Sequence, residues 1–141
     1  METIHKLSLN NLKRVVGVSA KHNKKVQWHS SEITIKQLLS AQEYIAVTQN
    51  ILRDCLAPDG TVAIELIDFA IRANIVAAYA YVELPTEFEE LYYVLYASDL
   101  YDKVCSVANK AQITEIEKTI AIYVQTLQTE SKVEEGANGW V

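Results

Sequence analysis

Histidine and cysteine are the residue types in this sequence that could bind a metal ion or act as a nucleophile. His5, His22 and His29 all lie near the N-terminus, whereas Cys55 and Cys105 lie far from them and from each other. Zinc ligands are usually spaced as in H-x3-H or C-x2-C, and neither spacing occurs. Neither cysteine lies in a motif typical of a catalytic nucleophile. We therefore expect two reduced thiols, with a disulfide between them left open, and no metal or cofactor.

Paired carboxylates could support general acid–base chemistry, and two groups of them occur. Glu65 and Asp68 form one pair, and Glu87, Glu89 and Glu90 form a second cluster. Acid–base catalysis requires a carboxylate in a pocket that shifts its pKa. The periodicity predicts the first pair on the solvated stripe of a helix. It places the second cluster in the first turn of another helix, where the positive end of the helix dipole stabilises acidic side chains. We therefore rank an enzyme last among the functional classes and expect no small-molecule substrate.

Asn74 is a polar residue within the most apolar stretch of the chain, residues 62–82. At about 100° per residue it lies opposite the polar stripe of its helix, so its amide is expected to be buried. A buried amide needs hydrogen-bond partners, and the end of a neighbouring helix or the hydroxyl of Tyr81 could supply one. We interpret Asn74 as a structural residue, with a contact to a ligand or a partner as the alternative.

Four of the eight tyrosines lie in the segment FEELYYVLYASDLYDKV, residues 88–104. A stacking surface for nucleic acid needs basic residues among the rings, but this segment has four carboxylates and only Lys103. We predict that Tyr92 and Tyr101 belong to the core of a helical bundle, with their hydroxyls at its rim. Tyr93 and Tyr96 lie nearer the edge of that face, and we interpret them as protein–protein contacts.

The charge is divided unevenly along the chain. Residues 1–36 carry seven basic and two acidic residues, a net charge of +5, whereas residues 37–141 carry six basic and sixteen acidic residues, a net charge of −10. A basic arm beside an acidic body favours docking onto an acidic protein, including a second copy of this chain, over nucleic-acid binding. The alternative is a solvated, loosely ordered terminus. The residues expected to bind a partner are Lys13, Arg14, Lys21, Lys24, Lys25, Trp28, Tyr93, Tyr96 and Trp140, although Trp140 could also pack on its own bundle.

Two alternating segments near the N-terminus predict a small β-hairpin. In VQWH (residues 26–29) and EITIK (residues 32–36), apolar residues occupy every second position, and serines lie between the segments. An isolated hairpin is marginal in water, so it must pack on the helices or on another subunit. Residues 1–25 show no sustained period, and we expect an extended arm there with at most one short strand.

From Ser40 onward the apolar residues recur every three or four positions, which is typical of helices. Ser40 and Glu43 form a capping box at the start of the first helix, and a long helix is expected from about residue 62 to 83. Thr86 and Glu89 predict a second capping box at the start of the third helix. Ser98-Asp99 predicts the start of a short helix, and we expect the final helix to end near residue 130. The polar stripe of the long helix comprises Glu65, Asp68, Arg72, Tyr79 and Glu83. The inner faces of the third and last helices comprise Phe88, Leu91, Tyr92 and Leu95, and Ile113, Ile116, Ile120, Tyr123, Val124 and Leu127.

These elements predict a mainly α protein with about five helices in a bundle, a small N-terminal β-hairpin and extended termini. A chain of 141 residues with four glycines and two prolines fits one such domain. We divide it into a basic N-terminal arm and hairpin (1–38), a helical bundle (39–130) and a C-terminal tail (131–141). Charges interrupt the most apolar stretch and no signal peptide opens the chain, so we expect a soluble intracellular protein without a membrane partner.

The order of segments provides one resemblance. VQWHSSEITIK precedes the capped helix SAQEYIAVTQNILRDC, a PDG turn, the long apolar helix and LYYVLYASDLYDKV. Over about residues 26–130 this order resembles small helical proteins encoded among the head, neck and tail genes of tailed bacteriophages. The resemblance implies a virion or assembly subunit, capsid-associated, neck or tail, in the virion or the host-cell cytoplasm. It transfers no catalytic residue.

We therefore expect a non-enzymatic structural or assembly subunit of a larger protein complex. Its partners would be neighbouring virion subunits or copies of itself, contacted through the basic arm and the C-terminal tail. The alternative is a small acidic helical regulator or inhibitor that binds a host protein through its acidic helical face.

Overall fold

The computed structural model describes residues 6–20 and 23–138, with only the backbone described for residues 16–20 and 130–138. Within these ranges the chain has six helices and one antiparallel hairpin and is 63% helical, which confirms the mainly α prediction. The elements are α1 (Leu9–Ala20), β1 (Asn23–Trp28), β2 (Ser31–Lys36), α2 (Ala41–Asp54), a 3-10 turn η1 (Ile64–Leu66), α3 (Ile67–Tyr79), α4 (Phe88–Tyr96), α5 (Leu100–Val107) and α6 (Lys110–Asn138).

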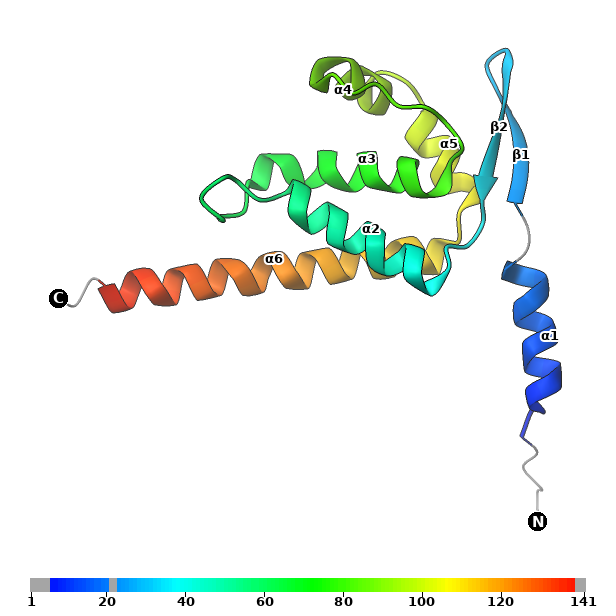
Figure 1. Cartoon of the computed structure of the whole chain (residues 1–141), viewed down its shortest axis with the longest axis horizontal. Coiled ribbons are helices and arrows are strands. Elements are labelled where there is room, and N and C mark those ends of the chain that lie inside the picture. The colour runs from blue at the N-terminus through cyan, green and yellow to red at the C-terminus, as the bar shows by residue number, and fades with distance from the viewer. Residues whose placement is uncertain (1–5, 21–22, 139–141) are drawn as a thin grey trace.

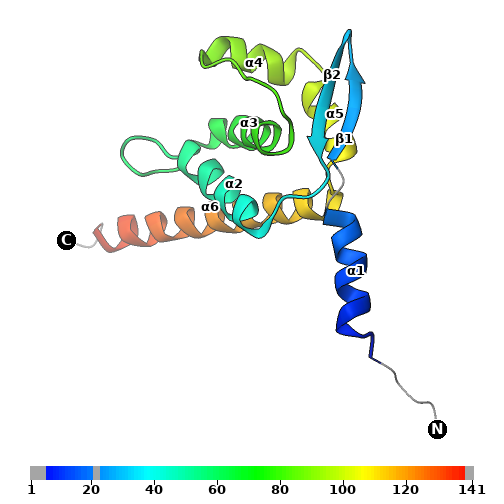
Figure 2. The ribbon, with the colours of Figure 1, turned by 45° about the vertical axis from the view of Figure 1, so that its right-hand side comes forward.

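The bundle is built around α2, which packs against both α3 and α6, while α3 also contacts α4 and α5 (Figure 1). The hairpin stands at one end of the bundle against α5, and α1 points away from the other elements in both views (Figures 1 and 2). The core is aliphatic, with Tyr79 as its one fully buried aromatic ring among the described residues. Its most deeply buried side chains are Tyr79, Ile35, Ile51, Ile75, Leu95, Ile116, Ile120, Val76, Val104 and Cys55.

The hairpin forms as the alternating pattern predicts. Val26 pairs with Ile33 and Trp28 with Ser31, and His29 in the turn adopts a left-handed φ of 55°. Ile33 and Ile35 are buried because they face the bundle. The backbone N–H of Tyr81 donates to the Thr34 carbonyl over 3.0 Å. This bond attaches β2 to the segment that follows α3, so the bundle supplies the packing that an isolated hairpin lacks.

Gln112 of α6 connects three parts of the fold. Its Oε1 accepts hydrogen bonds from the backbone N–H of Leu39, over 2.8 Å, and from the hydroxyl of Tyr79. Its Nε2 donates to the Leu39 carbonyl over 3.1 Å. One turn earlier, the backbone N–H of Asn109 donates to the Gln37 carbonyl over 2.7 Å. The start of α6, the end of α3 and the β2–α2 connection are therefore held at one junction.

The expected capping box at the start of α2 is present, because Ser40 and Glu43 exchange both hydrogen bonds. The second capping box is wrong: α4 begins after Glu87 without a side-chain cap, and Thr86 precedes that residue. The long helix is shorter than expected, since α3 covers Ile67–Tyr79 and is preceded by η1. Tyr79 was expected on the solvated stripe, yet it is completely buried with its hydroxyl on Gln112.

Both termini differ from the expected extended conformation. Residues 9–20 form α1, in which Leu9, Leu12 and Val15 recur every three positions with Lys13 and Arg14 between them. This short amphipathic pattern was overlooked because Asn, Gly and Ser residues interrupt the surrounding sequence. At the other end α6 continues to Asn138, although residues 131–138 have no apolar period. Extending an existing helix adds one hydrogen bond per residue without a new nucleation step, so it needs no apolar face.

The inner faces of α4 and α6 are also partly different from the prediction. Phe88 and Tyr92 of α4 and Tyr123 of α6 are exposed, whereas aliphatic residues beside them are buried. Leu95 of α4 and Ile113, Ile116, Ile120 and Val124 of α6 take the core positions.

In the described part of the chain, no helix combines the length and apolarity needed to cross a membrane.

The junction at Gln112 generates a test of stability. The substitution Gln112→Ala leaves the buried Tyr79 hydroxyl and the Leu39 backbone without their side-chain partner, so we expect a loss of about 2–4 kcal/mol in unfolding free energy. Urea denaturation followed by circular dichroism measures this loss. Gln125→Ala, on an exposed turn of the same helix, is the control and should change stability by less than about 0.5 kcal/mol. Equal effects of the two substitutions would contradict the proposed role of Gln112.

Candidate functional site

The outer face of α4 carries four exposed aromatic side chains. Phe88 is 59%, Tyr92 45%, Tyr93 56% and Tyr96 38% exposed. At about 100° per residue, Phe88, Tyr92 and Tyr96 follow one another along this face, and Glu89 lies between Tyr96 and Tyr93. Glu90 lies at its edge. We call Phe88, Glu89, Glu90, Tyr92, Tyr93 and Tyr96 the α4 surface.

The sequence of α4 explains why these rings face outward. Its aliphatic residues Leu91, Val94 and Leu95 share the opposite side and pack into the core, where Leu95 is almost completely buried. A nine-residue helix cannot bury both faces against one neighbouring layer, so the aromatic face remains outside. Glu89 and Glu90 occupy the first turn, where the positive end of the helix dipole stabilises their carboxylates.

The exposed rings contact one another. Tyr92 stacks on Tyr96 with the ring centroids 4.8 Å apart, and it meets Tyr93 edge to face at 6.0 Å. Phe88 lies 4.8 Å from Phe69 of α3, also between centroids. These ring contacts restrict one another's rotamers, so the aromatic side chains support one another on the α4 surface.

Arg72 of α3 anchors one end of the α4 surface. Its guanidinium lies 4.6 Å from the ring centroids of both Tyr96 and Tyr101. Its Nε donates to Asp68 Oδ2 over 3.0 Å, and the hydroxyl of Tyr96 donates to the same oxygen over 2.6 Å. Asp68 and Arg72 therefore form an i,i+4 ion pair. It also fixes the position of Tyr96.

Burial and the hydrogen bond to Asp68 raise the pKa of Tyr96 to about 12, while the Arg72 charge acts in the opposite direction. Burial likewise raises the pKa of Tyr101 above its ordinary value. At neutral pH the Tyr96 hydroxyl is therefore protonated and donates to Asp68. The phenol of Tyr96 is suited to binding through hydrogen bonds and stacking, because proton transfer at neutral pH requires a pKa near 7.

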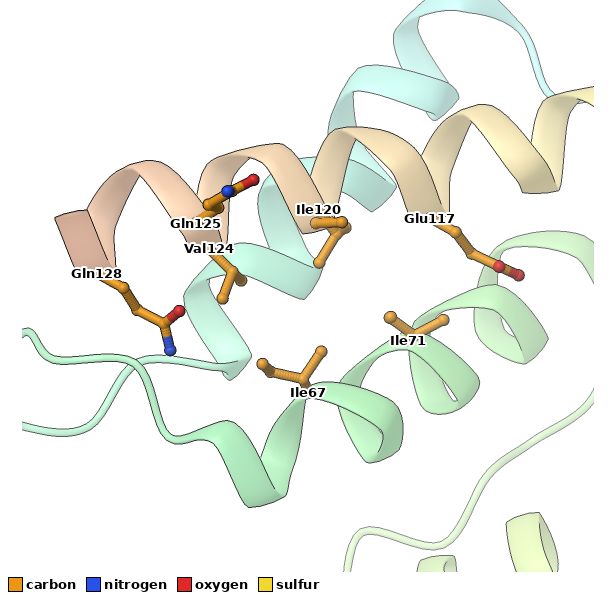
Figure 3. A pocket seen from close by; sticks show the side chains of 8 residues that line it. Ile67, Ile71, Glu117, Ile120, Val124, Gln125 and Gln128 are labelled. Atoms are coloured by element: carbon orange, nitrogen blue, oxygen red, sulfur yellow. The ribbon is translucent and has the colours of Figure 1, made fainter.

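A groove of about 300 Å³ lies between α3 and α6 (Figure 3). Figure 3 shows Ile67 and Ile71 of α3 pointing toward Ile120 and Val124 of α6. The other residues that line it are Glu117, Ala121, Gln125 and Gln128. Glu117 is the one ionisable group among its lining residues. The groove is therefore better suited to binding an apolar side chain than to catalysis.

A second groove, of about 280 Å³, lies between α2 and α3 and includes Lys36, Glu43, Asn50 and Asn74. The ammonium of Lys36 contacts the Glu43 carboxylate, and this hydrogen bond is the main reason that the pKa of Glu43 lies below its usual value. A carboxylate with a lowered pKa is a weak base at neutral pH. Lys36 and Glu43 therefore form a structural ion pair in this groove.

Asn74 is half-buried and has structural partners. Its Nδ2 donates to Asp54 Oδ2, over 3.0 Å, and to the Ala70 carbonyl, over 2.8 Å. Asp54 is the last residue of α2, so the bond connects α3 to the end of a neighbouring helix. The alternative partner Tyr81 is exposed, and its ring centroid lies 5.5 Å from the ammonium of Lys36.

The cysteines are free thiols, with Cys55 buried and Cys105 half-buried. Burial raises the pKa of both thiols above the ordinary value, which suppresses the thiolate at neutral pH. In the described residues, no three His, Cys, Asp or Glu side chains are placed to hold a metal ion.

The residues expected to bind a partner fall into separate groups. Tyr93 and Tyr96 come together on the α4 surface, joined by Phe88 and Tyr92, which sequence reasoning placed inside. The four-residue spacing of Phe88, Tyr92 and Tyr96 was the available signal for this face. Trp28 is half-buried, and its Nε1 donates to Asp99 Oδ1 over 2.7 Å, so its indole N–H is used within the chain.

The basic candidates lie on α1 and on the hairpin. Lys13 and Arg14 are exposed on α1, and Lys24 and Lys25 are exposed on β1, where Lys25 Nζ lies 3.9 Å from Glu32 Oε1. Lys21 and Trp140 lie outside the described residues. On α1, Leu9 is 63% and Leu12 is 48% exposed. The helix therefore presents apolar and basic side chains together, away from the bundle (Figure 2).

Comparisons with protein-family models, curated proteins and solved structures find no match to this chain. The exposed side chains of α1 and the α4 surface are therefore the features that bear on its function.

The pKa of Tyr96 generates a test of the site. Because the raised value favours the protonated phenol in the folded state, its stabilising effect is present below about pH 10 and is lost as the pH rises to about 12. In an absorbance titration of tyrosinate, the difference between wild type and Tyr96→Phe should have its midpoint near pH 12. Asp68→Asn should lower that midpoint, because the carboxylate raises the pKa. An unchanged midpoint in Asp68→Asn would contradict the contact.

Proposed function

We propose that this chain is a non-enzymatic subunit of a larger protein assembly and that it joins its neighbours through α1 and the α4 surface. The observation that carries the proposal is α1, a twelve-residue helix that points away from the bundle with Leu9 and Leu12 exposed. Helices this short are marginal in water unless an apolar face is packed. A partner that covers these leucines would stabilise the helix, by about 1.5–3 kcal/mol for each fully buried side chain.

The α4 surface supports the same proposal. Protein interfaces are enriched in tyrosine, phenylalanine and arginine, and their strongest contributors are well-ordered aromatic and arginine side chains. Tyr96 is held in place by Asp68 and Arg72 before any partner binds, which reduces the entropy lost on association.

The protonation states of the polar groups support a binding role over catalysis. The pKa of Tyr96 is raised, the pKa values of both thiols are raised and the pKa of Glu43 is lowered. These shifts move each group away from proton transfer at neutral pH. The resemblance of residues 26–130 to phage-encoded helical proteins supports a virion subunit, capsid-associated, neck or tail, in the particle or the host-cell cytoplasm.

A second candidate function is a small regulator or inhibitor that binds a host protein through an acidic helical face. The carboxylates of Glu89 and Glu90 on the α4 surface favour it, since they would attract a basic partner. This function does not require α1, so removal of α1 distinguishes the two candidates.

The test is co-expression of the chain with the proteins encoded by the genes that neighbour its own. We expect a complex of defined mass in size-exclusion chromatography with light scattering. Deletion of residues 1–20, which leaves β1 intact, should weaken the complex at least about tenfold, because the apolar face of α1 is lost.

A second variant, Leu9→Ser/Leu12→Ser in the full chain, removes the same apolar face without shortening the chain or changing its charge. It should weaken the complex similarly. Circular dichroism verifies that the bundle remains folded. A chain that elutes alone as a monomer, separates from every co-expressed protein and is unaffected by the deletion would refute the proposed function.

A further inference from the structure

We propose that α1 of one copy of this chain packs on the α4 surface of a second copy, so that copies join head to tail. The inference rests on the proposed function and identifies one partner of the α4 surface as the chain itself.

The two surfaces are complementary in side-chain type. On α1, Leu9 and Leu12 are exposed with Lys13 and Arg14 beside them. On α4, Phe88, Tyr92 and Tyr96 form an exposed apolar row, and Glu89 and Glu90 lie beside it. Leucine side chains pack well on aromatic rings, and cations pair with carboxylates or lie over tyrosine faces.

The wider charge distribution favours the same pairing. The first 36 residues have a net charge of +5, whereas residues 37–141 have a net charge of −10. Complementary potentials steer association and fix the orientation of the partners. An anionic membrane is disfavoured as the partner of α1, because the acidic part of the chain would be repelled by its headgroups.

The lengths of the two helices agree. With a rise of about 1.5 Å per residue, the nine residues of α4 span roughly 13 Å and the twelve residues of α1 roughly 18 Å. An antiparallel or parallel pair of these helices can therefore be in contact along the whole of α4.

The arrangement of the helices places this contact between two copies. In both views α1 and α4 lie at opposite ends of the molecule (Figures 1 and 2). The α1 that meets an α4 surface therefore belongs to another chain. Because the two contacting surfaces are different, the interface is heterologous, and repetition gives a ring or an open chain of subunits.

The α3–α6 groove is a weaker match for α1. The groove offers apolar side chains, but Glu117 is the one charged residue among those that line it. The α4 surface offers two carboxylates beside an exposed aromatic row, so it satisfies both the leucines and the cations of α1.

The test uses charge reversal in the full chain. The first variant is Lys13→Glu/Arg14→Glu, and the second is Glu89→Lys/Glu90→Lys. Wild type should self-associate in sedimentation velocity and light scattering, and raised salt should weaken this association. Each variant alone should self-associate at least about tenfold more weakly, since like charges then face each other.

An equimolar mixture of the two variants is the decisive measurement. In the mixture, the acidic α1 of the first variant meets the basic α4 surface of the second. The unchanged α1 of the second variant meets the unchanged α4 surface of the first. Association should therefore return in the mixture. A mixture that remains dissociated would overturn the proposal.

Two controls carry the same changes of charge at other positions. Lys110→Glu/Lys118→Glu and Glu115→Lys/Glu117→Lys, all at exposed positions of α6, should keep the self-association of wild type. If the Glu115→Lys/Glu117→Lys variant dissociates and the α4 variant does not, α1 binds the α3–α6 groove and the proposal is wrong. Binding of wild type to anionic vesicles without any self-association would also overturn it.

The outcome separates this inference from the proposed function. A wild-type chain that stays monomeric alone, yet forms an α1-dependent complex with co-expressed proteins, refutes the head-to-tail contact and leaves the proposed function standing. A chain that forms neither assembly refutes both.

Discussion

The carboxamide of Gln112 holds together the parts of the chain on which the remaining structure depends. It bonds both backbone groups of Leu39 and the buried hydroxyl of Tyr79, so it joins the start of α6 to the end of α3 and to the β2–α2 connection. The hairpin is attached at the same end through Thr34 and Tyr81. With β2 and α3 fixed relative to each other, the bond from Trp28 to Asp99 fixes the start of α5 and the turn after α4.

The position of α4 follows from this framework. Leu95 faces a core that α3 and α5 have already shaped, so the aliphatic side of α4 turns inward and the aromatic side remains exposed. Arg72 of α3 then holds the end of α4 in position, because its guanidinium lies against the rings of Tyr96 and Tyr101 and its Nε donates to Asp68. A row of tyrosines on one helix becomes an ordered surface through residues of two others.

The fold also converts a charge difference along the chain into a charge difference in space. The basic N-terminal segment includes α1 and the hairpin, while most carboxylates belong to the helices that follow. Because α1 points away from the bundle and α4 lies at its far end, each molecule presents a basic apolar helix on one side and an acidic aromatic face on the other (Figure 1). Such polarity suits assembly in one direction.

Local patterns were sufficient for the helical class, the hairpin and the Ser40–Glu43 cap, because periodicity and capping involve residues close in sequence. The periodicity also placed Tyr93 and Tyr96 near the edge of the inner face of their helix, and both are exposed. The exposure of Phe88 and Tyr92, the burial of Tyr79 and the partner of Trp28 depended on residues distant in the chain. A period shows that a helix has an apolar side, but where aromatic and aliphatic residues share that side, only the neighbouring elements determine which of them is buried.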